Sequence, residues 1–262
     1  MPTEAAASAV HAVSAAPAVD DAHAAPAVPA DAPTGTPDAS NAQHRLITHL
    51  QSMARARKGA RFGVALSGGC DSACLTAAMA CAGLDAKAYI AKTAFQPERD
   101  IADALKAARV AGLPAEIIEL DVFAHPDICA NPPDRCYLCK RLIFGSIRRA
   151  MAADGRHILC DGTNLDDDPA RRPGFRALAE LDVRSPLREA GMTKADVREA
   201  GRALGAVAAD KPSFSCWATH VPEGQPLTPA SIAAARDAML PHAAEEPATS
   251  EAAHETPCAK PE

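Results

Sequence analysis

The sequence has no long apolar run, no extended basic block and no Lys or Arg before Arg45. A membrane-spanning helix needs about 18 or more consecutive apolar residues, so we expect no such span. A secretory signal peptide has a basic start and a Leu- or Phe-rich centre, which the first residues lack. Nucleic-acid binding draws on clustered Lys and Arg, and the formal net charge is −6. We therefore expect a cytoplasmic protein without a membrane partner, and tight nucleic-acid binding is disfavoured.

Both ends of the chain are poor in side chains that a core can bury. Residues 1–42 are mostly Ala, Pro, Val, Asp, Ser and Thr, and residues 241–262 are Ala-, Glu- and Pro-rich. Such segments cannot bury enough apolar surface to fold, so we expect two disordered tails. The expected folded part consists of an α/β domain over 43–205 and a loop with a C-terminal helix over 206–240.

Apolar runs alternate with helical segments in the central part of the chain. Strands are expected at 62–66, 87–91, 115–120 and 157–160, with a further short strand near Val183 and a loop at 121–135. Helices are expected at 71–83, from about 97, at 137–152 and at 194–204, where Thr193 looks like an N-cap. This alternation predicts a Rossmann-like α/β fold with a parallel sheet and a small C-terminal helical appendage.

One glycine-rich turn between a strand and a helix is the most informative segment, Ser67-Gly68-Gly69-Cys70-Asp71-Ser72. Two glycines let the backbone approach an anion without a Cβ clash, and the N–H groups at the following helix start favour negative charge. Two serine hydroxyls can bind phosphate oxygens, and Asp71 can cap the helix or hold Mg²⁺. The turn therefore predicts a pyrophosphate-binding site.

Two better-known phosphate motifs are missing. No Gly-Lys-Ser/Thr follows the glycines, which excludes the P-loop kinase pattern, and Gly-x-Gly-x-x-Gly is absent as well. The segment resembles the PP-loop of the ATP-pyrophosphatase superfamily, whose folds are of the adenine nucleotide alpha hydrolase type. That resemblance implies cleavage of ATP between its α and β phosphates and transfer of AMP to a carbonyl or carboxylate oxygen.

Other polar residues lie at the expected carboxyl ends of strands. Thr93 follows the second strand, and Asp161-Gly162-Thr163-Asn164 follows the fourth. Ligands of parallel α/β sheets bind at this edge, so we expect Thr93, Gly162 and Thr163 to join the phosphate-binding turn around one nucleotide.

Nine cysteines in a chain without an export signal indicate reduced thiols, used for packing, metal binding or catalysis. Cys136 and Cys139 lie three residues apart at a predicted helix start, so both sulfurs face one side and can share a metal. A packed helix start and a redox pair remain alternatives. Cys216 lies in a Pro- and Ser-containing loop, where a single cysteine is a weak signal by itself. We expect a core role for the others on predicted helices and strands: Cys70, Cys74, Cys81 and Cys160.

Taken in order, these segments resemble the LarE family of ATP-dependent sulfur transferases, which build the nickel-pincer cofactor. The resemblance covers about residues 43–240 and depends on segments in a fixed order: Ser67–Ser72, Arg135–Lys140, Asp161–Asn164 with Asp166-Asp167, Arg172-Pro173-Gly174, Arg184–Leu187, Thr193-Lys194, and Lys211-Pro212-Ser213 leading to Cys216. The family usually has Cys-Leu-x-Ser-Arg at the sulfur site, where this chain has Cys216-Trp217-Ala218-Thr219-His220. The family's C-terminal Arg-x-Arg segment is replaced by acidic, proline-rich sequence after Leu240.

The resemblance implies a reaction in two stages on a nucleotide-like pyridinium dicarboxylate. A substrate carboxylate attacks the α-phosphorus of Mg-ATP and releases pyrophosphate, and a sulfur nucleophile then displaces AMP to leave a thiocarboxylate. Asp71 is the implied magnesium ligand, and Arg172, Arg184 and Ser185 are the implied substrate-binding residues. The protein could form a homo-oligomer, which the sequence does not decide.

The resemblance implies two sources of sulfur. Cys216 aligns with the sulfur-donating position and is left as dehydroalanine in one branch of the family. In another branch three cysteines hold a [4Fe–4S] cluster with one iron free of a protein ligand. The presence of Cys136 and Cys139 besides Cys216 favours the cluster.

Three other functions remain as alternatives. A tRNA thiolase of the same superfamily would need a basic surface, against which the charge balance argues. An ammonia-using amide ligase would not need Cys216. A non-catalytic nucleotide-binding relative would show no ATP–pyrophosphate exchange.

Overall fold

The structure, a computed structural model, describes residues 39–243 of the chain. Its first helix is α1 (Ala39–Arg55) and its last is α9 (Pro229–Ala243), so each helix extends a few residues past the limits expected from the sequence. The rest of the two predicted tails lies outside the described residues. Within the described range, no helix is both long and apolar enough to cross a bilayer.

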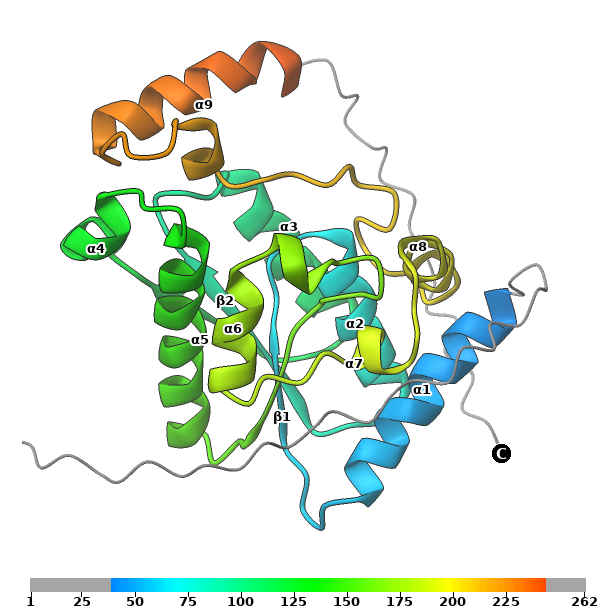
Figure 1. The fold of residues 1–262 in the computed structure, drawn as a ribbon. Coiled ribbons are helices and arrows are strands. Elements are labelled where there is room, and N and C mark those ends of the chain that lie inside the picture. Colours follow the sequence, from blue (N-terminus) through cyan, green and yellow to red (C-terminus); the bar gives the residue numbers. More distant parts are fainter. Residues whose placement is uncertain (1–38, 244–262) are drawn as a thin grey trace, which may run out of the picture. The chain divides into compact units, whose positions relative to one another are not determined.

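Four parallel strands form the sheet, in the order β3-β2-β1-β4 (Figure 1). They are β1 (Phe62–Ala65), β2 (Ala86–Lys92), β3 (Ala115–Glu119) and β4 (Ile158–Cys160). The predicted parallel α/β fold is thus confirmed. Because the chain places β2 and β3 on one side of β1 and returns to place β4 on the other, the order reverses between β1 and β4. Ligands of such sheets bind at that reversal, beyond the carboxyl ends of the strands.

Helices cover both faces of the sheet. α1, α2 (Cys70–Cys81), α3 (Glu98–Val110) and α8 (Lys194–Ala203) supply the core on one face, and α5 (Arg135–Ala153) with α6 (Gly174–Glu180) covers the other. Alternate residues of the strands serve the two faces, as the pleat of a strand requires. Phe62 and Val64 belong to the first core, whereas Gly63 faces α5 so closely that a Cβ there would lie 2.5 Å from Met151 Sδ.

The helix starts follow local sequence signals. Thr193 and Asp196 form a capping box at the start of α8, which confirms Thr193 as its N-cap. The predicted strand near Val183 is wrong, because only an isolated bridge between Cys160 and Arg184 forms there. Asp182 with a φ of 47° ends the α6 segment and Pro186 begins α7 (Pro186–Glu189), so too few extended residues remain for a strand.

The predicted loop at 121–135 contains two short helices, η1 (Val122–Ala124) and α4 (Pro126–Cys129). The Asp121 side chain caps η1, and Pro126 occupies the first turn of α4, where a missing N–H costs nothing. These helices, η3 (Trp217–His220) and α9 enclose a separate apolar cluster that includes Phe95, Val122 and Ile232. This C-terminal cluster shares no member with the cores on the two sheet faces.

Candidate functional site: a phosphate-binding loop and a group of thiols

The glycine-rich turn lies between β1 and α2, at the carboxyl edge of the sheet where the strand order reverses. Gly68 has a φ of 79°, and a Cβ there would lie 2.0 Å from the Asp100 carbonyl oxygen. Gly69 differs, since a Cβ on it would meet nothing nearer than Ser67 Oγ at 3.6 Å. Gly68 is therefore required by the turn itself, whereas the missing side chain of Gly69 leaves open space beside the backbone.

Ser72 closes the turn from the first turn of α2. Its hydroxyl accepts from the Ser67 N–H at 3.2 Å, donates to the Gly69 carbonyl at 3.2 Å and lies 3.1 Å from Ser67 Oγ. No side chain caps the N-terminus of α2 at Gly69. The N–H groups of that turn are therefore available to an anion, as the sequence predicted.

The segment after β4 packs against this loop. A Cβ on Gly162 would lie 2.7 Å from the Ser72 nitrogen, so only glycine permits the close approach. Asn164 Nδ2 donates to Asp71 Oδ1 at 3.2 Å, and Thr163 Oγ1 donates to Asp161 Oδ2 at 2.5 Å. The structure thus brings the predicted Gly162 and Thr163 together with the turn Ser67–Ser72, which we call the phosphate-binding loop after its predicted role.

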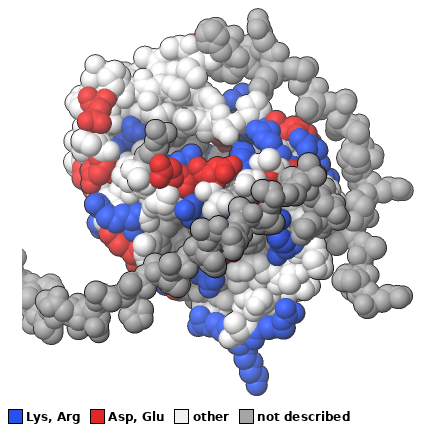
Figure 2. Space-filling view, turned by 45° about the vertical axis from the view of Figure 1, so that its right-hand side comes forward, with Lys and Arg blue, Asp and Glu red and all other residues white. Residues whose placement is uncertain are grey.

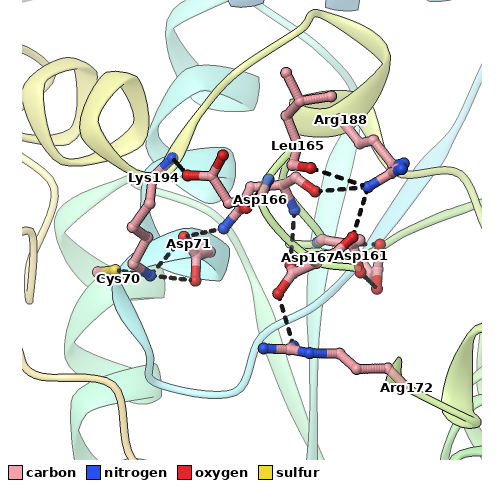
Figure 3. A network of polar contacts seen from close by, with 11 residues as sticks. Cys70, Asp71, Asp161, Leu165, Asp166, Asp167, Arg172, Arg188 and Lys194 are labelled. Carbon is pink, nitrogen blue, oxygen red and sulfur yellow. Dashed lines mark hydrogen bonds and ion pairs between the residues drawn. The ribbon is translucent and has the colours of Figure 1, made fainter. Parts of the chain in front are cut away.

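Lys194 contacts the loop from the first turn of α8 (Figure 3). Its Nζ lies 2.6 and 2.8 Å from the two carboxylate oxygens of Asp71 and 2.8 Å from Cys70 Sγ. Burial by itself would lower the pKa of Lys194, but the bonds to Asp71 and Cys70 raise it above its ordinary value. Lys194 is therefore a fixed positive charge beside the loop.

The same contacts bear on the magnesium that the resemblance implies. Both carboxylate oxygens of Asp71, its predicted ligand, already accept from Lys194 Nζ. A metal ion at Asp71 does not fit this arrangement of side chains unless the ammonium group moves aside. The positive charge next to Asp71 comes from Lys194 itself.

A second lysine reaches the loop from the segment that leads to Cys216. Lys211 Nζ donates to the Gly68 carbonyl at 3.1 Å and to Asp100 Oδ1 at 2.8 Å, and it also contacts Asp103. The lysine thereby joins this segment to both the phosphate-binding loop and α3.

The segment Leu165–Ala170 follows β4, and we call it the acidic loop. Two arginine side chains fix its conformation. Arg188 Nη1 donates to the carbonyl oxygens of Asn164, Leu165 and Asp167 at 3.2, 3.3 and 2.8 Å (Figure 3). Arg172 Nη1 lies 2.7 Å from Asp167 Oδ1. Figure 2 shows acidic and basic side chains interspersed on the part of this face that is not drawn in grey.

Each of the three residues expected to bind substrate is bonded to an acidic side chain in this structure. Arg172 is bonded to Asp167, and Ser185 Oγ donates to Asp161 Oδ1 at 2.7 Å. Arg184 makes two bonds to Glu189, at 2.8 and 2.5 Å. Arg172 and Ser185 thus support the loops after β4, while the Arg184 guanidinium is already paired.

Thr93 lies at the end of β2 and is nearly buried. Its Oγ1 accepts from the Phe95 N–H at 3.2 Å, which shapes the turn into α3. Thr93 also lines a cavity of about 940 Å³ together with Arg99, Trp217 and Arg236, but no residue of the phosphate-binding loop lines it. The cavity therefore lies over the ends of β2 and β3, beside the loop and not within it.

Three thiols lie near enough to the start of α5 to influence one another's ionisation, and we call them the thiol group (Cys136, Cys139 and Cys216). Burial is the main cause that raises the pKa of Cys139 to about 12, and the neighbouring Cys216 and Cys136 act in the same direction. Burial also raises the pKa of Cys216, while the guanidinium of Arg135 acts in the opposite direction. The structure thus brings together the cysteines that the sequence singled out, although they lie far apart in the chain.

The thiol group fits an iron–sulfur cluster in number and in chemistry, because soft thiolates are its ordinary ligands. Among the described residues, however, no group of three or more His, Cys, Asp or Glu side chains is arranged to hold a single metal ion. A cluster bound through three different irons sets its thiolates farther apart than the ligands of one ion. The cluster therefore stays a prediction.

The other predicted cysteine positions are as expected. Cys74 and Cys160 are buried in the core, Cys81 is half-buried, and Cys70 is buried at the start of α2. The sequence assigned no site role to Lys194 or Lys211, and it indicated Arg135 only as a flanking charge that favours thiolate at the Cys136–Cys139 pair. Each of them does lie beside a recognised signal, namely the Thr193 cap, the Pro212-Ser213 pair and the Cys136–Cys139 pair.

The fold and the loop define an α/β protein of the adenine nucleotide alpha hydrolase type. An NMN synthetase from Francisella tularensis has a similar fold, with a TM-score of 0.56 and 19% identity over 68% of this chain and 76% of that chain. No family model matches the chain.

Curated relatives make the assignment narrower. The chain is 30% identical over 175 residues to the pyridinium-3,5-bisthiocarboxylic acid mononucleotide synthase of Lactiplantibacillus plantarum, covering 66% of this chain and 63% of the synthase. It is 35% identical over 168 residues to an uncharacterized protein of Synechocystis, covering 63% of this chain and 62% of that protein. It therefore spans less than two thirds of the length of these relatives. The chain is therefore similar in sequence to that synthase over 175 residues, which agrees with the resemblance to the LarE family found in the sequence.

Proposed function

We propose that this chain is an ATP-dependent sulfurtransferase of cofactor biosynthesis. It would adenylate a substrate carboxylate with release of pyrophosphate and then convert that group to a thiocarboxylate. The name of the L. plantarum relative suggests the substrate, because a bisthiocarboxylic product requires pyridinium-3,5-dicarboxylic acid mononucleotide as its oxygen counterpart. The product would serve a nickel-pincer nucleotide cofactor.

The observation that carries the proposal is the path of one segment. Lys211 Nζ is bonded to the Gly68 carbonyl of the phosphate-binding loop, and Cys216, farther along the same segment, joins the thiol group. The Trp217 N–H, directly after Cys216, donates to the Phe95 carbonyl at 2.8 Å, at the end of β2. One short stretch of chain thus connects the place for a triphosphate with the place for a sulfur nucleophile.

The residues at the loop suit the adenylation step. The N–H groups at the start of α2, which no side chain caps, would stabilise the charge that develops on the leaving pyrophosphate. Lys194 and Lys211 add positive charge beside them, each held in place by aspartates. Attack of a substrate carboxylate oxygen on the α-phosphorus would convert the substrate to an acyl-adenylate. AMP would then be the leaving group of the next step.

The thiol group suits the second step. Cys216 would attack the acyl-adenylate as a thiolate, the nucleophilic form of cysteine, and expel AMP to form a thioester. Loss of the Cys216 Cα proton would then break the Cβ–Sγ bond, so that the sulfur stays on the product as a thiocarboxylate and Cys216 becomes dehydroalanine. Arg135 beside Cys216 favours the thiolate against the effect of burial. Cys136, Cys139 and Cys216 are also the residues that would hold a [4Fe–4S] cluster, which would supply an iron able to carry an extra sulfide.

Separating the two half-reactions tests the proposal. ATP–pyrophosphate exchange with pyridinium-3,5-dicarboxylic acid mononucleotide measures adenylation, and mass spectrometry of the product measures sulfur transfer. In Cys216→Ser we expect exchange within about twofold of the wild type and sulfur transfer at background. The matched control is Cys129→Ser, because Cys129 Sγ donates to the backbone carbonyls of Val122 and Phe123, as a serine hydroxyl also can.

The outcomes are distinct. Unchanged sulfur transfer in Cys216→Ser would remove the role of that cysteine. Amide formation from ammonia that survives the substitution would indicate an amide ligase. The absence of pyrophosphate exchange in the wild type, with Mg²⁺ and substrate present, would contradict adenylation and favour a non-catalytic nucleotide-binding protein.

A further inference from the structure

Arg135 is the first residue of α5 and its side chain is nine-tenths buried. Its Nη1 donates to the Ala218 carbonyl at 2.6 Å and to Asn131 Oδ1 at 2.8 Å, and its Nη2 donates to Cys136 Sγ at 3.4 Å. The guanidinium thus touches both parts of the thiol group: the helix that carries Cys136 and the η3 segment that begins after Cys216.

Asn131 continues the same connection from the turn before α5. It is 1% exposed and has a φ of 52°, an unusual backbone conformation for a residue other than glycine. Its Nδ2 donates to the Pro222 carbonyl at 2.8 Å, and its own carbonyl accepts from the Gly224 N–H at 2.9 Å. The η3 segment is therefore held at its start by Arg135 and at its end by Asn131.

The charge of Arg135 sets it apart from an ordinary structural arginine. Within the part of the chain that the structure describes, its bonds go to a carbonyl, an amide oxygen and a sulfur, and no carboxylate pairs with it. A buried cation is costly unless neighbouring groups offset its charge. The position of this cation beside the thiol group makes it a partner for negative charge on sulfur.

We propose that Arg135 is the positioning residue of sulfur transfer, which fastens the segment carrying Cys216 to the helix carrying Cys136 and Cys139. This inference rests on the proposed function for its catalytic meaning. The adenylation step does not depend on Arg135, because the bonds that shape the phosphate-binding loop come from Ser72, Lys194 and Lys211. Loss of Arg135 should therefore affect the second half-reaction and spare the first.

The experiment compares Arg135→Ala and Arg135→Lys with Arg148→Ala. Arg148 is the matched control, because it also lies on α5 and donates to a backbone carbonyl, that of Leu181, away from the thiol group. With pyridinium-3,5-dicarboxylic acid mononucleotide, we expect Arg135→Ala to keep ATP–pyrophosphate exchange within about twofold and to lose about tenfold or more of its sulfur transfer. Arg135→Lys should lose less, and methylguanidinium should restore part of the transfer in Arg135→Ala.

A second measurement needs no activity. In the full chain, reduced and treated with a chelator, we expect diamide to link Cys216 to Cys139 or Cys136, as peptide mapping detects. Arg135→Ala should slow this link about tenfold, and Arg148→Ala should leave it unchanged. Equal linking rates in the wild type and Arg135→Ala would overturn the inference, as would equal sulfur transfer. A wild type that neither adenylates nor transfers sulfur would instead contradict the proposed function, and the linking rates would still decide the role of Arg135.

Discussion

Lys194 and Asp71 form an ion pair of 2.6 Å at the phosphate-binding loop, although they are distant in sequence. The pair joins the start of α8 to the start of α2, and Asn164 donates to the same carboxylate from the segment after β4. Three chain segments therefore meet at Asp71. This meeting point, and not the glycine-rich motif alone, defines the site.

Lys194→Met tests the positive charge at this point. The substitution keeps an unbranched side chain but removes the charge that we expect beside the phosphates of ATP, and a charge-assisted contact contributes about 1.5–3 kcal/mol. We expect kcat/KM of ATP–pyrophosphate exchange to fall about ten- to a hundredfold. Lys106→Met is the control, because Lys106 is exposed on α3. Unchanged exchange in Lys194→Met would show that the phosphates bind elsewhere.

The two glycines of the loop should respond differently to alanine. In Gly68→Ala the new Cβ would lie 2.0 Å from the Asp100 carbonyl oxygen at a φ of 79°, so we expect a loss of about 1–3 kcal/mol in the free energy of unfolding. Gly69→Ala meets nothing within 3.4 Å and should change that free energy by less than about 0.5 kcal/mol.

Gly69→Ala should nevertheless weaken ATP binding, because its methyl group would project into the open space beside the loop. Isothermal titration calorimetry with ATP measures this effect, and urea unfolding measures stability. Full ATP affinity in a stable Gly69→Ala variant would contradict an anion at this position.

Glu189 gives the fold a pH-dependent contribution. Although burial raises its pKa, bonds to His49 and Arg184 lower it from 4.5 to about 2. Because the pKa is lowered in the folded state, the stabilisation is complete above pH 4.5 and is lost as the pH falls toward 2. We expect Glu189→Gln to cost about 1 kcal/mol at pH 7, after allowance for solvent screening, and less at pH 3.5. Urea unfolding at both pH values measures this, with exposed Glu223→Gln as the control.

The thiol group predicts a visible property of the protein. If Cys136, Cys139 and Cys216 hold a [4Fe–4S] cluster, anaerobic purification should yield a brown protein with about four irons and matching sulfide per chain. Cys139→Ser should lower the iron content, and Cys129→Ser should not. A colourless anaerobic preparation that still makes one thiocarboxylate per chain would instead indicate that Cys216 gives up its own sulfur, with a mass loss of about one H₂S.

Local signals allowed much of the fold to be predicted from the sequence. The four strands, the glycine turn and the Thr193 cap each depend on residues close together in the chain, so periodicity and capping rules are sufficient there. The meeting of Thr163, Gly162 and the phosphate-binding loop followed from topology, because parallel strands place their carboxyl ends at one edge.

The bonding partners of the charged side chains were the part of the site that the sequence did not reveal. Arg184 carries a charge suited to a phosphate, but its neighbour Glu189 binds it at two points, and only the start of α7 at Pro186 brings that carboxylate within reach. Arg135 looked like a flanking charge of the cysteine pair, because its contact with Ala218 depends on how a distant segment folds back. The contact of Arg135 is set by tertiary packing and leaves no pattern in the linear sequence, whereas the pairing of Arg184 with Glu189 depends on the local position at which α7 begins.

The C-terminal cluster shares no buried residue with the two cores on the faces of the sheet. Opening it would expose Trp217 and Ile232 without disturbing Val64 or the strands, so the protection of backbone amides should fall into two levels, with 217–243 exchanging sooner. Cys216 would thus belong to the part of the molecule with the lower local stability, whereas the nucleotide would bind to the part with the higher local stability. On heating or oxidation, the protein should then lose its sulfur-transfer activity before it loses ATP–pyrophosphate exchange.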